Sequence, residues 1–368
     1  MSMNNALIES SRVMAVCNAC RYCEGYCAVF PAMGLRRVLS DPDLKYLSNL
    51  CHNCRACYYA CQYAPPHEFA VNVPAALAEL RLETYRQFAV PGASAKLFSR
   101  NGPIVSIITV SSVAILFLLA LVFQGPDTLL SPQTGENAFY TVVPYLAMVI
   151  PASILGLYIL GTLCMGVLRF WFDTGGTLNQ LVNPRAHSQA IGEVLRLRYL
   201  AGHGEGCNYP DDRFSHIRRW FHHLIFYGFF LCLASTTVAA FYDHILHKAA
   251  PYPPLSLPVL LGTIGGLALL AGTTGSFYLK LRMDKAPSAP QFFSLDIEFL
   301  ILLFLTSLTG LLLLLLRETP AMGGLLIIHL GIVAGLFITM PYGKFVHGFY
   351  RYAALVRNAI EQIEQEEQ

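Results

Sequence analysis

After Asn101, the chain contains six long apolar stretches, whereas residues 1–100 mix apolar and polar positions. The stretches are residues 104–123, 142–170, 220–242, 258–279, 295–316 and 325–345. Each has about 20 residues or more, the length that a helix needs to cross the hydrocarbon core of a bilayer. The pattern therefore predicts six transmembrane helices.

The first hundred residues show the periodicity of amphipathic helices. Residues 74–88 place Leu77, Leu80, Tyr85 and Phe88 at helical spacing, and residues 41–50 predict a short connecting helix. We therefore expect an all-α protein with three parts. These are a helical head (residues 1–100), a membrane domain (101–350) and a short tail (351–368).

Composition supports an integral membrane protein. The chain is 55% hydrophobic and 13% charged, whereas soluble domains have roughly 25% charged residues. The formal net charge of +2 gives no indication of nucleic-acid binding. Residues 1–16 lack a long apolar run, so no signal peptide is expected.

Basic residues are concentrated in alternate loops. Seven arginines lie in residues 169–219, and further basic residues follow the fourth and sixth stretches, whereas the opposite loops hold only Lys248 and Arg317. Positively charged loops remain on the cytoplasmic side. We therefore expect a multi-pass protein of the bacterial inner membrane with both termini in the cytoplasm.

Eight of the 11 cysteines form two runs of the same spacing, CxxCxxCxxxC, offset by 34 residues. They are Cys17, Cys20, Cys23 and Cys27, and then Cys51, Cys54, Cys57 and Cys61. This spacing is typical of two-cluster ferredoxins, in which the fourth cysteine of each run binds the other cluster. The repeat predicts two [4Fe–4S] clusters with crossed ligand sets. One set is Cys17, Cys20, Cys23 and Cys61, and the other is Cys51, Cys54, Cys57 and Cys27.

Two other uses of these cysteines are less consistent with the pattern. Structural zinc needs four ligands and would leave cysteines unused, and disulfides need an oxidising compartment. Ferredoxins place proline directly after the fourth cysteine, but Ala28 and Gln62 stand there. Because the flanking residues also have helical character, we expect a helical two-cluster domain, similar to those of succinate dehydrogenase and heterodisulfide reductase iron–sulfur subunits.

Histidines near the cytoplasmic ends of two predicted spans are candidates for haem ligands. His222 and His223 lie where the third span begins, and His347 lies on the same side of the membrane. A pair made by His347 with His222 or His223 would hold one b-type haem close to the clusters.

A second haem would need ligands near the outer face. His329 is 18 residues before His347, or five turns of a straight helix and about 27 Å along its axis, although Pro341 lies between them. His244, at the end of the third span, is its candidate partner.

Several stretches resemble the tricarballylate/citrate utilisation protein B family over nearly the whole chain. Besides the two cysteine runs, they are RRWFHHLIFYGFFLCLAST (218–236), LTGLLLLLLRETPAMG (308–323), HLGIVAGLFITMPYGKFVHGFYR (329–351) and GHGEGCNYPDDRFS (202–215). The last four spans are more distantly similar to the nitrate reductase gamma subunit and the heterodisulfide reductase cytochrome b subunit. In nitrate reductase gamma, the paired histidines of the last haem-binding helix match the spacing of His329 and His347, but a further histidine is replaced here by Cys232 or Leu233.

The resemblance implies a role in electron transfer. Members of the family reoxidise a soluble flavoprotein, tricarballylate dehydrogenase, and pass its electrons to the membrane. We therefore predict that electrons pass from flavin through two clusters and haem b to quinone, in an electron-transfer subunit with no catalytic residue of its own. The Arg-rich loop of residues 169–219 is a candidate docking surface, and equally a positive-inside anchor.

Three other functions remain open at this point. A heterodisulfide-reductase-like complex would need its cysteine-rich catalytic module on a partner, since this chain has no Cys-Cys pair. A membrane redox sensor or assembly factor would use the clusters without quinone chemistry. A transporter would need intramembrane charges, which are few apart from Asp296 and Glu298, and would leave the cysteine runs unexplained.

Overall fold

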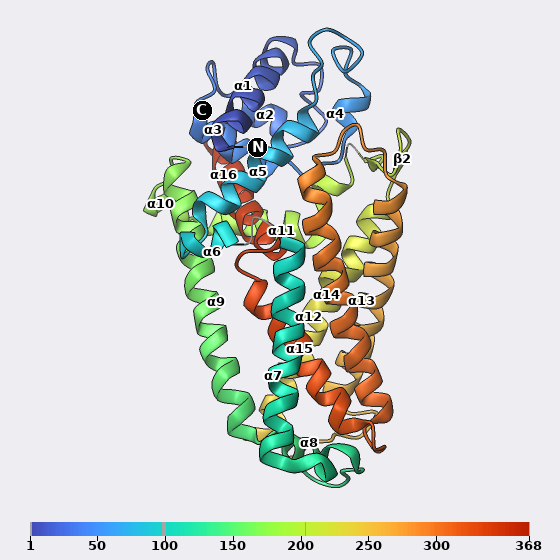
Figure 1. Cartoon of the computed structure of the whole chain (residues 1–368). Coiled ribbons are helices and arrows are strands. Elements are labelled where there is room, and N and C mark those ends of the chain that lie inside the picture. Colours follow the sequence, from blue (N-terminus) through green and yellow to red (C-terminus); the bar gives the residue numbers. More distant parts are fainter. Residues whose placement is uncertain (1, 98–100, 203, 368) are drawn as a thin grey trace.

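The computed structural model describes the whole chain apart from residues 1, 98–100, 203 and 368 (Figure 1). The described residues form a helical head above a bundle of long helices, and both termini lie in the head. Helices dominate the structure, and the strands in the described part are limited to one two-stranded hairpin. The predicted all-α fold is confirmed.

Short helices of the N-terminal segment build most of the head. They are α1 (Met3–Cys20), α2 (Val29–Gly34), α3 (Asp41–Leu50), α4 (Ala56–Tyr59), α5 (Val73–Phe88) and α6 (Gly92–Leu97). Helix α3 begins at a capping box, in which Ser40 and Asp43 satisfy each other's backbone N–H groups. Leu77 and Leu80 of α5 are fully buried against the other head helices, as the apolar spacing predicted.

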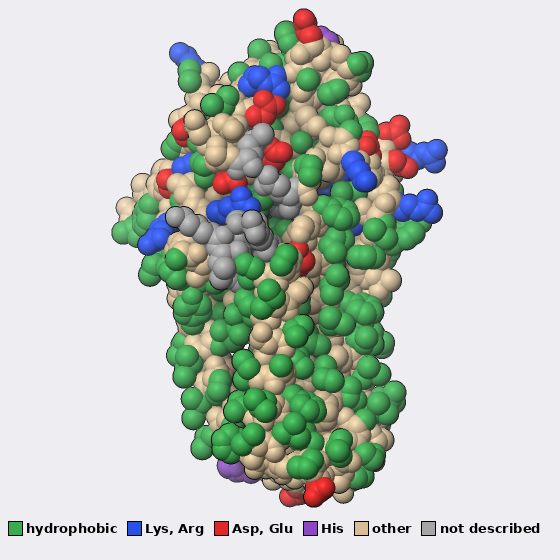
Figure 2. Space-filling model, viewed as in Figure 1, with side chains coloured by type: hydrophobic (Ala, Val, Ile, Leu, Met, Phe, Trp, Pro, Cys, Tyr) green, Lys and Arg blue, Asp and Glu red, His purple; other side chains and the backbone are tan. Residues whose placement is uncertain are grey.

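Six helices in the described part are long and apolar enough to cross a bilayer. They are α7 (Asn101–Leu130), α9 (Tyr145–Asp173), α12 (Ile217–His244), α13 (Leu257–Arg282), α14 (Pro290–Leu316) and α15 (Met322–Thr339). Figure 2 shows hydrophobic side chains covering the long bundle, with Lys and Arg gathered at the head end. This arrangement is that of a multi-pass membrane protein with a polar domain on one side.

The last long helix ends earlier than the hydropathy pattern predicted. Helix α15 stops at Thr339, and a turn leads into η3 (Lys344–Val346) and α16 (His347–Glu366). Pro341 lacks a backbone N–H and cannot continue the ladder of helix hydrogen bonds. His329 and His347 therefore lie on two different helices, not on one straight helix.

The C-terminal helix α16 completes the core of the head. It packs against α3, α9 and α11 (Pro184–Arg196). Its residues Ala354 and Leu355 are buried in the same core as residues of the N-terminal segment. Glu361 forms an ion pair with Arg36 and accepts a hydrogen bond from the hydroxyl of Tyr46 at 3.1 Å. The head therefore contains residues from both ends of the chain.

The segment between α9 and α12 forms a cover between the head and the bundle. Its elements are α10 (Leu178–Leu181), α11, η2 (Arg198–Leu200), β1 (Cys207–Asn208) and β2 (Phe214–Ser215). The backbone N–H of Asn208 donates to the carbonyl oxygen of Cys54 at 3.0 Å. The hairpin therefore contacts the second cysteine run directly. At the other end of the bundle, the short helix α8 (Ala138–Val142) connects α7 to α9.

Helices α12 and α13 approach closely because glycines lie between them. A Cβ atom added at Gly265 would be 2.8 Å from the carbonyl oxygen of Gly228, closer than such atoms normally come. Small residues allow this close approach in membrane helices. The contact fixes α12, the helix that carries His222.

Candidate iron–sulfur and haem sites

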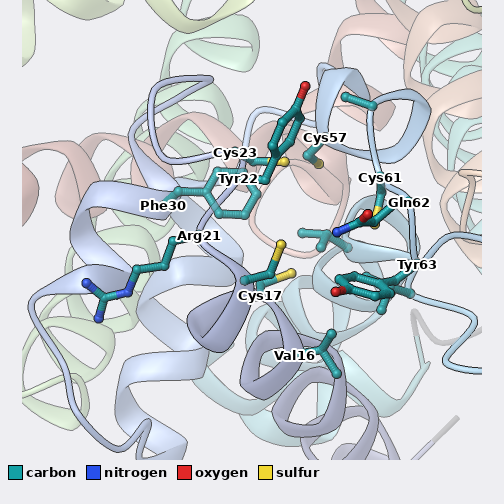
Figure 3. Close-up of a pocket in the computed structure, with 14 residues that line it drawn as sticks. Val16, Cys17, Arg21, Tyr22, Cys23, Phe30, Cys57, Cys61, Gln62 and Tyr63 are labelled. Atoms are coloured by element: carbon teal, nitrogen blue, oxygen red, sulfur yellow. The ribbon is translucent and has the colours of Figure 1, made fainter.

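A cavity of about 260 Å³ opens in the head between the two cysteine runs (Figure 3). It is lined by five cysteines, which are Cys17, Cys20, Cys23, Cys57 and Cys61. Val16, Phe30, Val71 and Val73 supply apolar walls. Arg21 and Tyr22, both exposed, stand at its edge. The cavity has the apolar lining and the group of thiols that a cluster needs.

Four thiols form the first group, and they come from both runs. The pKa of Cys17 is raised to about 12 by burial and by the nearby thiols of Cys61, Cys23 and Cys20. The pKa of Cys23 is raised to about 11 by burial and by Cys61 and Cys20. The structure therefore places Cys61, the last cysteine of the second run, beside the first three cysteines of the first run.

The complementary group is arranged in the same way. The pKa of Cys27 is raised well above its usual value by burial and by the thiols of Cys54 and Cys51. Burial also raises the pKa of Cys57, together with the thiols of Cys54, Cys27, Cys51 and Cys23. The structure thus brings Cys27 to the second run, and Cys57 lies between the two groups.

The two cysteine loops also share a backbone feature. The residue after the second cysteine of each run, Arg21 or Arg55, has a left-handed conformation, with φ of 54° and 67°. Side chains other than glycine and asparagine seldom adopt this conformation. The sequence repeat is therefore also a repeat in loop structure.

The donor groups around the thiols are of the kind that an iron–sulfur cluster uses. Backbone N–H groups point at sulfur atoms, since Asn53 N–H donates to Cys51 Sγ at 3.4 Å and the N–H groups of Val29 and Phe30 face Cys27. Such bonds stabilise thiolates on iron. Within the described residues no three His, Cys, Asp or Glu side chains converge on one point, as a single ion would require. Cluster thiolates each bind a different iron and stand farther apart.

Three arginines bond the second cysteine loop to α12, to α16 and to the segment between α13 and α14. Arg55 donates to the carbonyl oxygen of Asp284 at 3.1 Å and to Ser288 Oγ at 2.7 Å. Arg218 of α12 donates to the carbonyl oxygens of Asn53 and His52 at 2.6 and 3.3 Å. Arg351 of α16 donates to the carbonyl oxygen of Cys51 at 3.1 Å. The second group of thiols is therefore held directly over the ends of the long helices.

The structure brings His222 and His347 together at this end of the bundle. Their ring centroids are 6.3 Å apart, with an angle of 52° between the ring planes. Metal–imidazole bonds are about 2.0 Å long, so the two rings would be close enough to bind one metal ion together. The carbonyl oxygen of Lys344 accepts from His347 Nδ1 at 2.6 Å, which leaves the lone pair of Nε2 available to a metal ion. His222 Nδ1 is buried with no hydrogen-bond partner among the described residues.

His223 points elsewhere. Its ring contacts Trp220 and Tyr227, with centroid distances of 6.1 and 5.7 Å. Of the two adjacent histidines that the sequence left open, His222 is therefore the one that faces His347.

The outer histidines have separate partners. Thr309 Oγ1 of α14 lies 2.9 Å from His329 Nδ1, and the ring also contacts Gly310. The hydroxyl of Tyr145 lies 2.8 Å from His244 Nε2. The ring of His329 thus contacts α14, and the ring of His244 contacts α9. The described residues show no contact between these two histidines.

The sequence analysis did not single out Arg218 and Arg351, although their spacing from the histidines was visible in the sequence. Each lies four residues from a candidate haem ligand, Arg218 before His222 and Arg351 after His347. Residues four apart share a helix face. The pattern could have indicated that both histidines are accompanied by a cation.

Two family models and one curated protein match this chain. The model described as citrate utilization protein B matches residues 100–368, and that described as citrate utilization protein B Fer4-like domain matches residues 10–87. The chain is 48% identical over 357 residues to an Escherichia coli protein named citrate utilization protein B, covering 96% of this chain and 92% of that one. No solved structure matches it.

Proposed function

The chain belongs to the citrate utilization protein B family, whose Fer4-like domain indicates an iron–sulfur electron-transfer role, and we propose a specific route for its electrons. Electrons enter the head from a soluble flavoprotein dehydrogenase of the tricarballylate dehydrogenase type. They leave the membrane domain by reducing quinone. Two [4Fe–4S] clusters and one haem b connect these two ends.

The observation that carries the proposal is that three candidate sites follow one another in space. They are the first cysteine group, the second cysteine group and the pair of His222 and His347. Cys61 lies with the first cysteine run, and Cys27 lies with the second. The loop of the second run is then bonded to the helices that carry His222 and His347. Iron–sulfur clusters and haem, when bound, each accept and release one electron at a time, which is the chemistry this series of sites requires.

Each group of residues has a separate task in this scheme. The cavity around Cys17 opens at the surface beside the exposed Arg21 and Tyr22, where a donor protein can approach. Val16, Phe30, Val71 and Val73 keep water from the first cysteine group. Cys57 lies between the two groups and keeps them close. His222 and His347 hold the haem where the head meets the bundle.

The basic residues support an orientation with the head in the cytoplasm. Lys and Arg gather at the head end of the molecule (Figure 2), as expected for the inner side of a bacterial plasma membrane. A cytoplasmic head would meet a soluble dehydrogenase and a reducing environment that keeps thiols available for iron.

Quinone reduction by the purified protein tests the proposal. The anaerobic protein is reduced with dithionite, the excess is removed, and a soluble quinone analogue is added while the haem absorbance is followed. We expect the haem to be reoxidised as the quinone is consumed. A haem band that stays reduced in excess quinone would refute the route, and the matched variant His223→Ala should behave as the wild type.

A further inference from the structure

Two arginines stand between the second cysteine loop and the histidine pair. Arg218 is one turn before His222 on α12, and Arg351 is one turn after His347 on α16. Both donate to backbone carbonyl oxygens of residues 51–53, at distances from 2.6 to 3.3 Å. Each histidine helix therefore has its own guanidinium bond to the same loop.

Neither arginine has a carboxylate partner among the residues that the structure describes. The ion pairs found within 4.0 Å include neither of them. The nearby carboxylate Asp296 is already shared between Lys280 and Lys344. Arg351 Nε is also buried, with no hydrogen-bond partner in the described part of the chain.

The surroundings of Arg351 are unfavourable for a cation. The Nε atom of Arg351 is shielded from solvent, and the cation Arg81 lies nearby. A buried charge without a counter-ion is strongly destabilising. Such a site therefore calls for negative charge from a group beside it.

We propose that Arg218 and Arg351 are positioning residues that compensate the negative charge of the second cluster and hold it against the haem. This inference rests on the proposed function. A cubane with four thiolates is anionic, and it gains one more negative charge on reduction. Two cations beside the Cys51–Asn53 loop stabilise the reduced form and raise its reduction potential, because net charge and hydrogen bonding set that potential.

The consequence is a direction for electron flow. Among the described residues, two guanidinium groups without a carboxylate partner bond to the loop of the second thiol group. The first thiol group is bordered by Arg21, which lies at the surface and bonds to Asn18. The second cluster is then the better acceptor. The step that follows transfers one electron, with oxidation of the cluster by one charge, reduction of the haem iron by one, and no bond made or broken.

Redox titration of the complete protein tests this role. We expect Arg351→Gln and Arg218→Gln each to shift the second cluster's EPR signal to lower potential by a tenfold change in its equilibrium, about 59 mV for one electron. The signal lost in Cys51→Ser identifies the second cluster. The first cluster should titrate as in wild type, and Arg351→Lys should keep most of the potential.

The matched control is Arg86→Gln, which removes a head arginine that is ion-paired with Glu83. It should shift neither cluster. Unchanged potentials in the Gln variants would overturn the inference. Loss of the second cluster in both Arg351→Gln and Arg351→Lys would also overturn it, because Arg351 would then have a purely structural role. Loss in Arg351→Gln alone would support the need for the charge. A wild-type protein without clusters or haem would instead refute the proposed function.

Discussion

At the residue scale, the assignment of the last cysteine in each run has the sharpest consequences. Spacing alone could suggest crossing only by analogy with ferredoxins. The structure places Cys61 with Cys17 and Cys23, and Cys27 with Cys51 and Cys54. With the proposed crossed ligand sets, each cluster would depend on both loops.

Serine substitution of these two cysteines tests the crossing. Cys27→Ser should perturb the EPR signal of the cluster bound by the second run, and Cys61→Ser should perturb that of the first run. Serine preserves the size of the side chain but is a poor iron ligand. The variant Cys164→Ser, which changes an exposed cysteine of α9, is the control and should leave both signals unchanged. The opposite pattern of losses would show that each run binds its own cluster.

The histidines permit an equally direct comparison. His222→Ala should abolish the haem b band in a reduced-minus-oxidised spectrum, because it removes one of the two facing rings. His223→Ala should retain the band, because this ring contacts Trp220 and Tyr227. Retention of the band in His222→Ala and its loss in His223→Ala would reverse the assignment.

At the scale of elements, the sequence predicted the six long helices but not where the last of them ends. The six spans could be predicted because a bilayer requires about 20 apolar residues and the sequence supplies them. The break after Thr339 could not be located by hydropathy, because the residues after it are still apolar. Pro341 was the available signal, and the break is what turns His347 toward His222 on α12.

Close packing of α12 on α13 positions His222, a proposed haem ligand. Gly265→Leu would force a side chain against the backbone of Gly228 and Cys232, where an added Cβ already lies within 2.9 Å of several atoms. Overpacking of this kind costs about 1–3 kcal/mol. We expect a lower thermal unfolding midpoint and a smaller haem content per protein.

Gly156→Leu is the matched control for this substitution. Nothing lies within 4 Å of a Cβ atom added at Gly156 of α9, so the same leucine should be tolerated there. Equal haem content and thermal midpoint in the two variants would show that the α12–α13 contact does not position the haem ligand.

At the scale of the whole molecule, the sequence distinguished the head from the bundle. It did not predict which contacts connect distant parts of the chain. Composition separates residues 1–100 from the apolar spans, because burial in lipid and in a soluble core select different residues. The tail of residues 351–368 looked like a simple extension. Its placement in the head depends on contacts such as Arg36 with Glu361, 325 positions apart, which local periodicity cannot reveal.

The orientation of the molecule can be measured with reporter fusions at the C-terminus. Green fluorescent protein should fluoresce when fused after α16, and alkaline phosphatase should be inactive there, because the head is expected in the cytoplasm. The same reporters fused in the segment before α8 should behave oppositely. Active phosphatase at the C-terminus would place the head outside and contradict the proposed encounter with a soluble dehydrogenase.

The most direct test of the account is the cofactor content of the anaerobically purified wild-type protein. Iron, acid-labile sulfide and the reduced-minus-oxidised optical spectrum are measured on one sample. The account predicts about eight non-haem irons with as many sulfides per chain, as two cubanes require, together with a haem b band. Fewer than about four irons per chain, or a spectrum without that band, would contradict it.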